Sequence, residues 1–303
     1  MRGTKAAPNF GIFYNDTAGS QVAATQAATV KARLTAVGYQ CQLLTAPSIT
    51  AARQLLQQYL DQLDGLVVVG GDGTLNNAMA AMLESGCFVP LGLIPSGREN
   101  LFAKRWQISK DVEKACQIII SGRIKKVSAA VINHDYVCHT TLTIGTDPTA
   151  AIYELEQETP FRGWKQFRWW LNYLKKSPKL SLNYRFGNDE GHAILTRIFK
   201  VNPYVITKGP KHRDINQSNY TVRYLNSHPL TQLWAVSRMM LTRSLVTNVC
   251  HDQAQKQLVV VSNTDSKIIS VMLDGNLGPQ LPLEMTIVPN MYEFFLPSGN
   301  FIS

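Results

Sequence analysis

The residues best suited to chemistry in this sequence form a Gly-Gly-Asp-Gly-Thr turn at positions 70–74. An apolar run, Leu66–Val69, leads into the turn, and a helical pattern begins directly after it. Glycine lets the backbone approach a ligand closely and adopt positive φ, and the N-terminus of a helix attracts an anion. The pattern therefore predicts a phosphate-binding turn at the end of a buried strand.

Two side chains of this turn could act on a bound phosphate. Thr74 could cap the helix or donate a hydrogen bond to a phosphate oxygen. A carboxylate repels phosphate, so Asp72 would be suited to holding Mg²⁺, a water or a substrate hydroxyl. The turn fits neither GxGxxG nor GxxxxGK[ST]. A structural interpretation also stays open, in which the turn only joins a strand to a helix and Asp72 caps it.

Alternating strands and helices position this turn within the first 128 residues. The expected strands are 9–14, 39–44, 65–70 and 89–94, and the expected helices are 24–37, 49–63, 74–84 and 112–120. Apolar residues recur at helical spacing in the helices, and the strand at 65–70 is apolar throughout, as a strand buried on both faces should be. This order predicts a doubly wound α/β domain.

The pattern changes to strand-like runs separated by turn residues from about residue 125 onward. The main helical interruptions are expected at Ala150–Leu174 and Leu230–Leu241. We therefore expect an α/β domain at 1–128 and an all-β domain, a mostly antiparallel sandwich, at 129–290. The last strand, around 291–297, is a candidate to return to the first domain.

Composition limits the class of protein. The chain has 303 residues, of which 45% are hydrophobic, so it is long and apolar enough to fold into two globular domains. Its net charge of +9 favours an anionic partner, which could be nucleic acid, an anionic membrane or a phosphorylated ligand, although a merely basic protein stays open. Neither a secretory signal nor a membrane-spanning run is evident, so we expect a cytoplasmic protein.

Cysteine and histidine spacing gives no metal motif. The five cysteines are scattered without CxxC spacing, which is typical of buried thiols in a reducing compartment rather than of disulfides or a zinc site. His134 and His139 lie in a strand-like segment and are interpreted as ordinary core or surface residues.

A segment at Phe161–Lys176 combines three tryptophans with five basic residues. On a helix its aromatic residues fall near one face, a pattern that suits the headgroup region of an anionic bilayer. The same helix could instead pack onto the second domain through its aromatics, and both interpretations stay open. No RNP-type or helix-turn-helix signature supports nucleic-acid binding. The sequence also leaves a homodimer open.

Several segments together resemble the diacylglycerol kinase catalytic-domain family, which includes bacterial soluble lipid kinases and sphingosine kinases and is distantly similar to NAD kinases. Leu66–Thr74 looks like the family's glycine-rich signature, and 14–20 resembles its Asn-Pro-x-x-Gly turn. Leu91–Trp106 resembles its Gly-x-x-Pro-x-Gly-Thr-x-Asn segment, and 271–297 resembles the region around its Asp-Gly-Glu. The resemblance runs in the correct order from about residue 9 to 297.

The resemblance implies a kinase that moves the γ-phosphoryl of ATP, with Mg²⁺, to a hydroxyl of diacylglycerol or a related lipid. Asp72 would belong to the metal and phosphate region, and Asp274 would be the general base. Asp214 would be a second candidate metal ligand. The candidate nucleotide-binding residues are Asn15, Gly19, Thr45, Gly70, Gly71, Gly73, Thr74, Asn77, Ser96, Gly97, Arg98 and Asn100.

The sequence departs from this family at several positions that are usually acidic or bind the nucleotide. Asn77 and Asn276 replace glutamates, Arg98 replaces a threonine, and Asp214 is the only acid in the stretch 212–225. Amides cannot act as bases and are poorer magnesium ligands than carboxylates. Arg98 could hold phosphate or fill the pocket. An active lipid kinase, a slow or altered enzyme, a non-catalytic binder and a kinase of a soluble hydroxyl compound therefore stay open.

Overall fold

The computed structural model describes residues 7–15, 21–145, 168, 172, 180–186, 189–202, 220–226, 249–253, 257–262, 269 and 271–298. The described residues form two compact units. Unit 1 contains those up to Thr140 and from Val288 onward, and unit 2 contains those between Thr141 and Ile287. The sequence placed these boundaries near residues 128 and 290.

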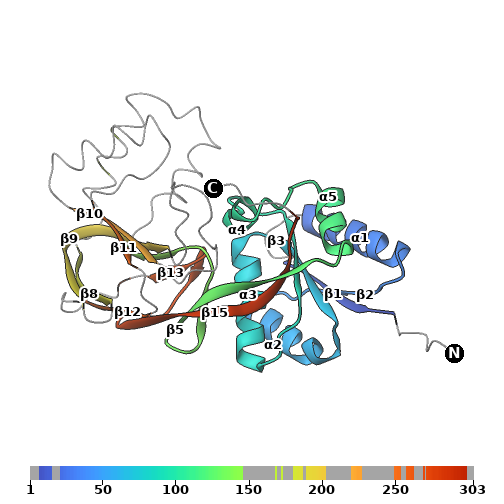
Figure 1. Ribbon diagram of the computed structural model, residues 1–303, viewed down its shortest axis with the longest axis horizontal. Coiled ribbons are helices and arrows are strands. Elements are labelled where there is room, and N and C mark those ends of the chain that lie inside the picture. The colour runs from blue at the N-terminus through green and yellow to red at the C-terminus, as the bar shows by residue number, and fades with distance from the viewer. Residues whose placement is uncertain are drawn as a thin grey trace. The chain divides into compact units, whose positions relative to one another are not determined.

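Unit 1 alternates strands with helices, as Figure 1 shows. Its strands are β1 (Asn9–Tyr14), β2 (Gln40–Leu44), β3 (Gly65–Gly70), β4 (Leu91–Pro95), β5 (Ile124–Ile132) and β6 (Tyr136–Cys138), with the end of β15 (Leu283–Phe295). Its helices are α1 (Gln21–Ala36), α2 (Ile49–Tyr59), the short 3₁₀ helix η1 (Leu60–Gln62), α3 (Asp72–Ser85), α4 (Leu101–Arg105) and α5 (Val112–Ile120).

The parallel strands of unit 1 run in the order β2-β1-β3-β4, and β15 pairs with β4 and β5. Helix α1 packs against α5, and α2 packs against α3, so the two pairs cover different faces of the sheet (Figure 1). The strand order reverses between β1 and β3. In open α/β sheets, ligands bind beyond the carboxyl ends of the strands at such a reversal. We therefore expect a ligand site at the edge of the sheet where β1, β3 and β4 end.

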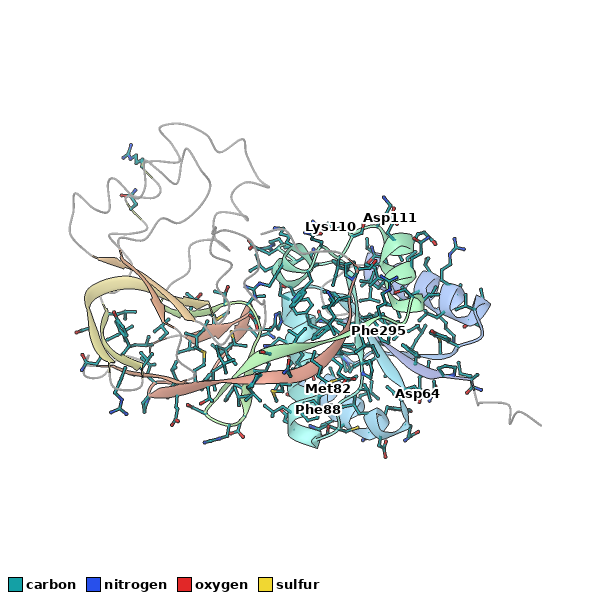
Figure 2. All side chains as sticks on the ribbon, viewed as in Figure 1. Asp64, Met82, Phe88, Lys110, Asp111 and Phe295 are labelled. Carbon is teal, nitrogen blue, oxygen red and sulfur yellow. The ribbon has the colours of Figure 1, made fainter. Side chains whose placement is uncertain are left out.

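The core of unit 1 lies between the sheet and its helices. All six residues of β3 are buried, and so is every residue from Leu75 to Met82 in α3. A helix that is buried on all sides belongs to the interior of the unit. The hydroxyl of Tyr292, on β15, donates to the Met79 carbonyl at 2.8 Å, and burial raises the pKa of Tyr292. Figure 2 shows the side chains crowded around Met82 and Phe295.

Unit 2 is built from antiparallel strands. They are β7 (Leu142–Gly145), β8 (Leu180–Phe186), β9 (Asp189–Asn202), β10 (Tyr220–Asn226), β11 (Val249–Gln253), β12 (Gln257–Ser262), β13 (Val271–Leu273), β14 (Asn276–Leu277) and the start of β15. Their order is β14-β13-β7-β9-β8-β12-β15, and β10 pairs with β9 on one side and with β11 on the other. The predicted fold class, an α/β domain with an antiparallel β domain, is confirmed.

Some expected features fall outside the residues that the structure describes. They include Gly19, Asp214 and nearly all of both expected helices of the second domain. Of the segment Phe161–Lys176, Arg168 and Asn172 are described, and both are helical and exposed. Within the described parts of the chain, no helix has the length and apolar character needed to cross a membrane.

Candidate active site

Most of the predicted nucleotide-binding residues lie at one edge of unit 1. Asn15 follows β1, Thr45 follows β2, the turn 70–74 follows β3, and the loop 96–100 follows β4. The strands are parallel, with Tyr14 opposite Val69, so their carboxyl ends reach the same edge. The structure therefore brings together segments that lie far apart in the sequence, as a site at the end of a parallel sheet requires.

Backbone contact joins the loop after β3 to the loop after β4. A Cβ atom added to Gly97 would lie 2.3 Å from the Gly71 Cα, and one added to Gly71 would lie 3.0 Å from the Gly97 Cα. The Ser96 amide also donates to the Gly70 carbonyl at 3.0 Å. Glycine is therefore required at position 97, and position 71 leaves little room for a larger residue, because the two backbones approach so closely.

Gly97→Ala is expected to separate these two loops. The new methyl group would meet backbone atoms, which cannot rotate away as a side chain can, so we expect a loss of about 1–3 kcal/mol in the free energy of unfolding. Chemical denaturation would measure this loss, with Glu99→Ala as an exposed control in the same loop. Equal stability of the two variants would show that the contact between the loops is dispensable.

The Asp72 carboxylate bridges the two loops a second time. Its Oδ2 accepts a hydrogen bond from the Leu101 amide at 2.8 Å, and its Oδ1 accepts one from the Phe102 amide at 2.9 Å. These are the first amides of α4, which lack acceptors within their own helix. The interpretation that Asp72 caps the helix following its own turn is therefore wrong, because α3 begins at Asp72 and the carboxylate caps α4 instead.

Asn100 explains why α4 takes its cap from another element. Asn100 is the N-cap residue of α4, in the left-handed conformation at φ 50° and ψ 51°. Its side chain is used within the preceding loop, where Oδ1 accepts from the Gly97 amide at 3.0 Å and Nδ2 donates to the Gly97 carbonyl at 2.6 Å. The loop after β4 is therefore closed by its own amide side chain and anchored to α3 by Asp72.

The first turn of α3 presents backbone to this edge. Its N-cap is Gly71, without a side-chain hydrogen bond to the helix, so the expectation that Thr74 caps the helix is wrong because α3 starts two residues earlier. The Thr74 side chain lies against Gly70, where an added Cβ would be 2.5 Å from the Thr74 Cβ. A 14-residue helix thus begins directly beside the contact between Gly71 and Gly97.

The sequence predicts no functional role for two residues that lie near this turn. The Asn76 side chain donates to the Val137 carbonyl at 2.6 Å and anchors α3 to β6. His139, 1% exposed, places its Nε2 3.2 Å from the Asp72 carbonyl oxygen. No spacing rule connects residues this far apart in the sequence. Asn77, in contrast, was named as a nucleotide-binding residue, and its 4% exposure places it in the interior of unit 1.

Asp274 occupies a tight hairpin turn in unit 2. Asp274 and Gly275 form the two-residue connection between β13 and β14, with φ of 51° and 92°. Type I′ hairpins need positive φ at both central residues and favour Asp-Gly. Asp274 Oδ1 accepts from the Thr141 amide, and its own amide donates to the Thr141 carbonyl, both at 2.9 Å. Asp274 therefore has a structural function, and its role as a base stays a prediction.

Among the residues that the structure describes, no three histidine, cysteine, aspartate or glutamate side chains gather as a metal-binding cluster. Arg98 is exposed on the loop after β4. The Asp72 carboxylate is held in place by the amides of Leu101 and Phe102.

Part of this chain is similar to known proteins. Residues 9–132 match the diacylglycerol kinase catalytic domain. A diacylglycerol kinase of Staphylococcus saprophyticus is 30% identical over 148 residues, which are 47% of this chain and 47% of that protein. One of Staphylococcus aureus (strain JH9) is 29% identical over 144 residues, which are 47% of this chain and 45% of that protein. The matches thus span about half the length of these curated relatives.

Solved structures share the fold across nearly the whole chain. A putative diacylglycerol kinase from Bacillus anthracis superimposes with a TM-score of 0.74 at 15% identity, covering 97% of this chain and 99% of that one. An NAD kinase from Archaeoglobus fulgidus in complex with ATP gives a TM-score of 0.53 at 12% identity, covering 95% and 93%. At these identities the likeness establishes the fold, which is the one that the sequence resemblance predicted.

Proposed function

We propose, from the diacylglycerol kinase catalytic domain that residues 9–132 match, that this protein is an ATP- and Mg²⁺-dependent lipid kinase. It moves the γ-phosphoryl group of ATP to a lipid hydroxyl. Diacylglycerol is the first candidate substrate because the curated relatives carry its name.

The observation that carries this proposal is the double bridge between the loops after β3 and β4. The backbone contact of Gly71 with Gly97 and the Asp72 carboxylate fix the two loops against each other. Phosphoryl transfer depends mainly on positioning and on electrostatic stabilisation rather than on covalent chemistry. A glycine backbone held beside the N-terminus of α3 is suited to binding a nucleoside triphosphate in one position.

The donor groups in unit 1 fit a magnesium ion that arrives with the nucleotide. Mg²⁺ usually keeps several waters and binds one or two carboxylates together with substrate phosphates, so a dedicated cluster of acids is not required. Asp72 would hold it, because each carboxylate oxygen has a second lone pair beyond its bond to an α4 amide. When bound, the ion would neutralise charge on the phosphates. Asp274 would take the proton of the attacking hydroxyl.

A transfer assay with labelled ATP and Mg²⁺ tests the proposal. Diacylglycerol in mixed micelles should become phosphorylated, and reactions without lipid should release no labelled product. ATP binding without any transfer to a lipid panel would favour a non-catalytic nucleotide or lipid binder. Transfer to soluble polyols in the absence of lipid would favour a kinase of soluble substrates.

Access to a bilayer-borne substrate through Phe161–Lys176 belongs to the same proposal, on the basis of its tryptophans and basic residues. Repeating the assay with neutral and anionic vesicles would examine this part separately. Equal rates on both kinds of vesicle would argue against an electrostatic contact with the membrane.

A further inference from the structure

His139 contacts both elements that the Asp72 carboxylate joins. Its ring Nε2 lies 3.2 Å from the Asp72 carbonyl oxygen. The ring meets the Phe102 ring edge-on, with centroids 5.5 Å apart and planes at 90°. Its main-chain carbonyl accepts a hydrogen bond from Arg105 Nη1 at 3.3 Å. His139 therefore touches the first residue of α3 and two residues of α4.

The direction of the ring hydrogen bond follows from its partner. A carbonyl oxygen can only accept, so Nε2 carries the proton and donates. The accepting carbonyl belongs to Asp72, the first residue of α3, whose carboxylate is bound to the Leu101 and Phe102 amides. The imidazole thus fixes the main chain of the same residue whose side chain holds the start of α4.

These contacts close a ring of interactions within unit 1. The Asp72 side chain reaches α4, α4 reaches His139 through Phe102 and Arg105, and the His139 ring returns to the Asp72 main chain. Since each contact limits a different motion, the three together restrict the rotation of the first turn of α3 relative to α4. His139 is 1% exposed, so water does not compete readily for its hydrogen bond.

We propose that His139 is a positioning residue for phosphoryl transfer, acting through Asp72. Its Nε2–H donor sets the orientation of the turn at 70–74 against the loop at 96–100, and through it the placement of the nucleotide phosphates. This inference rests on the proposed kinase function. A misplacement of about 1 Å at a reacting group can cost ~10²-fold in rate, so the loss of this one donor should be visible in kcat.

Two substitutions separate the hydrogen bond from the packing of the ring. His139→Gln keeps an N–H donor near the position of Nε2 and removes the ring, whereas His139→Phe keeps a ring against Phe102 and removes the donor. We expect His139→Phe to lower kcat by about tenfold to 100-fold, with a smaller change in the KM for ATP, and His139→Gln to stay within about threefold of the wild type. His134→Asn, at an exposed left-handed turn position, is the matched control.

A second measurement tests the contacts of His139 without an activity assay. Amide hydrogen exchange at Leu101 and Phe102, the donors to Asp72, should become about tenfold faster in His139→Phe and stay near the wild-type rate in His139→Gln. If the wild-type protein transfers no phosphate, the proposed function fails while the exchange rates still test His139. Loss of activity or of protection in His139→Gln would overturn the inference, and so would wild-type behaviour of His139→Phe. If His139→Phe does not fold, His139→Leu, which also removes the donor, takes its place with the same expected results.

Discussion

Asp274→Asn is expected to abolish phosphoryl transfer while leaving the protein folded. If Asp274 takes the proton of the attacking hydroxyl, its amide cannot replace it, and kcat should fall by about 10²- to 10⁴-fold. The measurement is the rate of lipid phosphorylation at saturating ATP, compared with the thermal stability of the same variant.

The hairpin should tolerate this substitution without a change in its backbone. Asparagine is favoured at the first position of a type I′ turn before glycine, so the connection between β13 and β14 should persist. The amide oxygen can still accept the hydrogen bond that the Thr141 amide donates to Asp274. The variant therefore removes the proton acceptor while it keeps the turn and this hydrogen bond.

The matched control for this experiment is Asp135→Asn. Asp135 is also an aspartate in a turn between two paired strands, β5 and β6, and it is exposed. It should keep wild-type activity. If Asp274→Asn also keeps the wild-type rate, Asp274 serves only the hairpin, and the general base must be sought elsewhere.

Asp72→Ala is expected to destabilise unit 1 more than the loss of an ordinary helix cap. It leaves the amides of Leu101 and Phe102 without their charged acceptor, and it removes one of the two bridges between the loops. We expect a loss of about 2–4 kcal/mol in the free energy of unfolding, together with loss of nucleotide binding. Asp72→Asn should lose less, because one oxygen remains as an acceptor.

A capping aspartate elsewhere in unit 1 provides the comparison. Asp111, labelled in Figure 2, is the N-cap of α5 and accepts from the Lys114 amide at 3.1 Å. Asp111→Ala should cost about 1 kcal/mol in denaturant titrations and leave nucleotide binding unchanged. Equal losses in Asp72→Ala and Asp111→Ala would mean that the link between the loops adds nothing to a simple cap.

The sequence predicted the elements of unit 1 well because their signals are local. The helix expected at 112–120 has those bounds in the structure, since its apolar spacing and the capping Asp111 agree. Helix α3 begins two residues before the expected start because Asp72 and Gly73 were interpreted as part of the turn. A Gly-Gly-Asp-Gly sequence gives little periodicity from which to place a helix boundary.

The contacts of the candidate site could not be predicted in the same way. Asp72 bonds to residues 29 and 30 positions away, and His139 lies 67 positions from Asp72, so no pattern of short period contains these pairs. Asp274 is a different case, because its Asp-Gly turn signal was present in the sequence. The resemblance to the family's Asp-Gly-Glu segment led to a prediction of proton transfer, and the hairpin was not predicted.

The shared strand β15 determines how the protein could be dissected. The match to the catalytic domain ends at residue 132, but Phe294 pairs with Leu91 of β4, and Tyr292 bonds to α3, so the interior of unit 1 is completed by residues from the far end of the chain. A fragment ending at Thr140 would expose the side of β4 that β15 covers. A recombinant version of unit 1 therefore needs residues 288–298 joined back through a linker or a circular permutation.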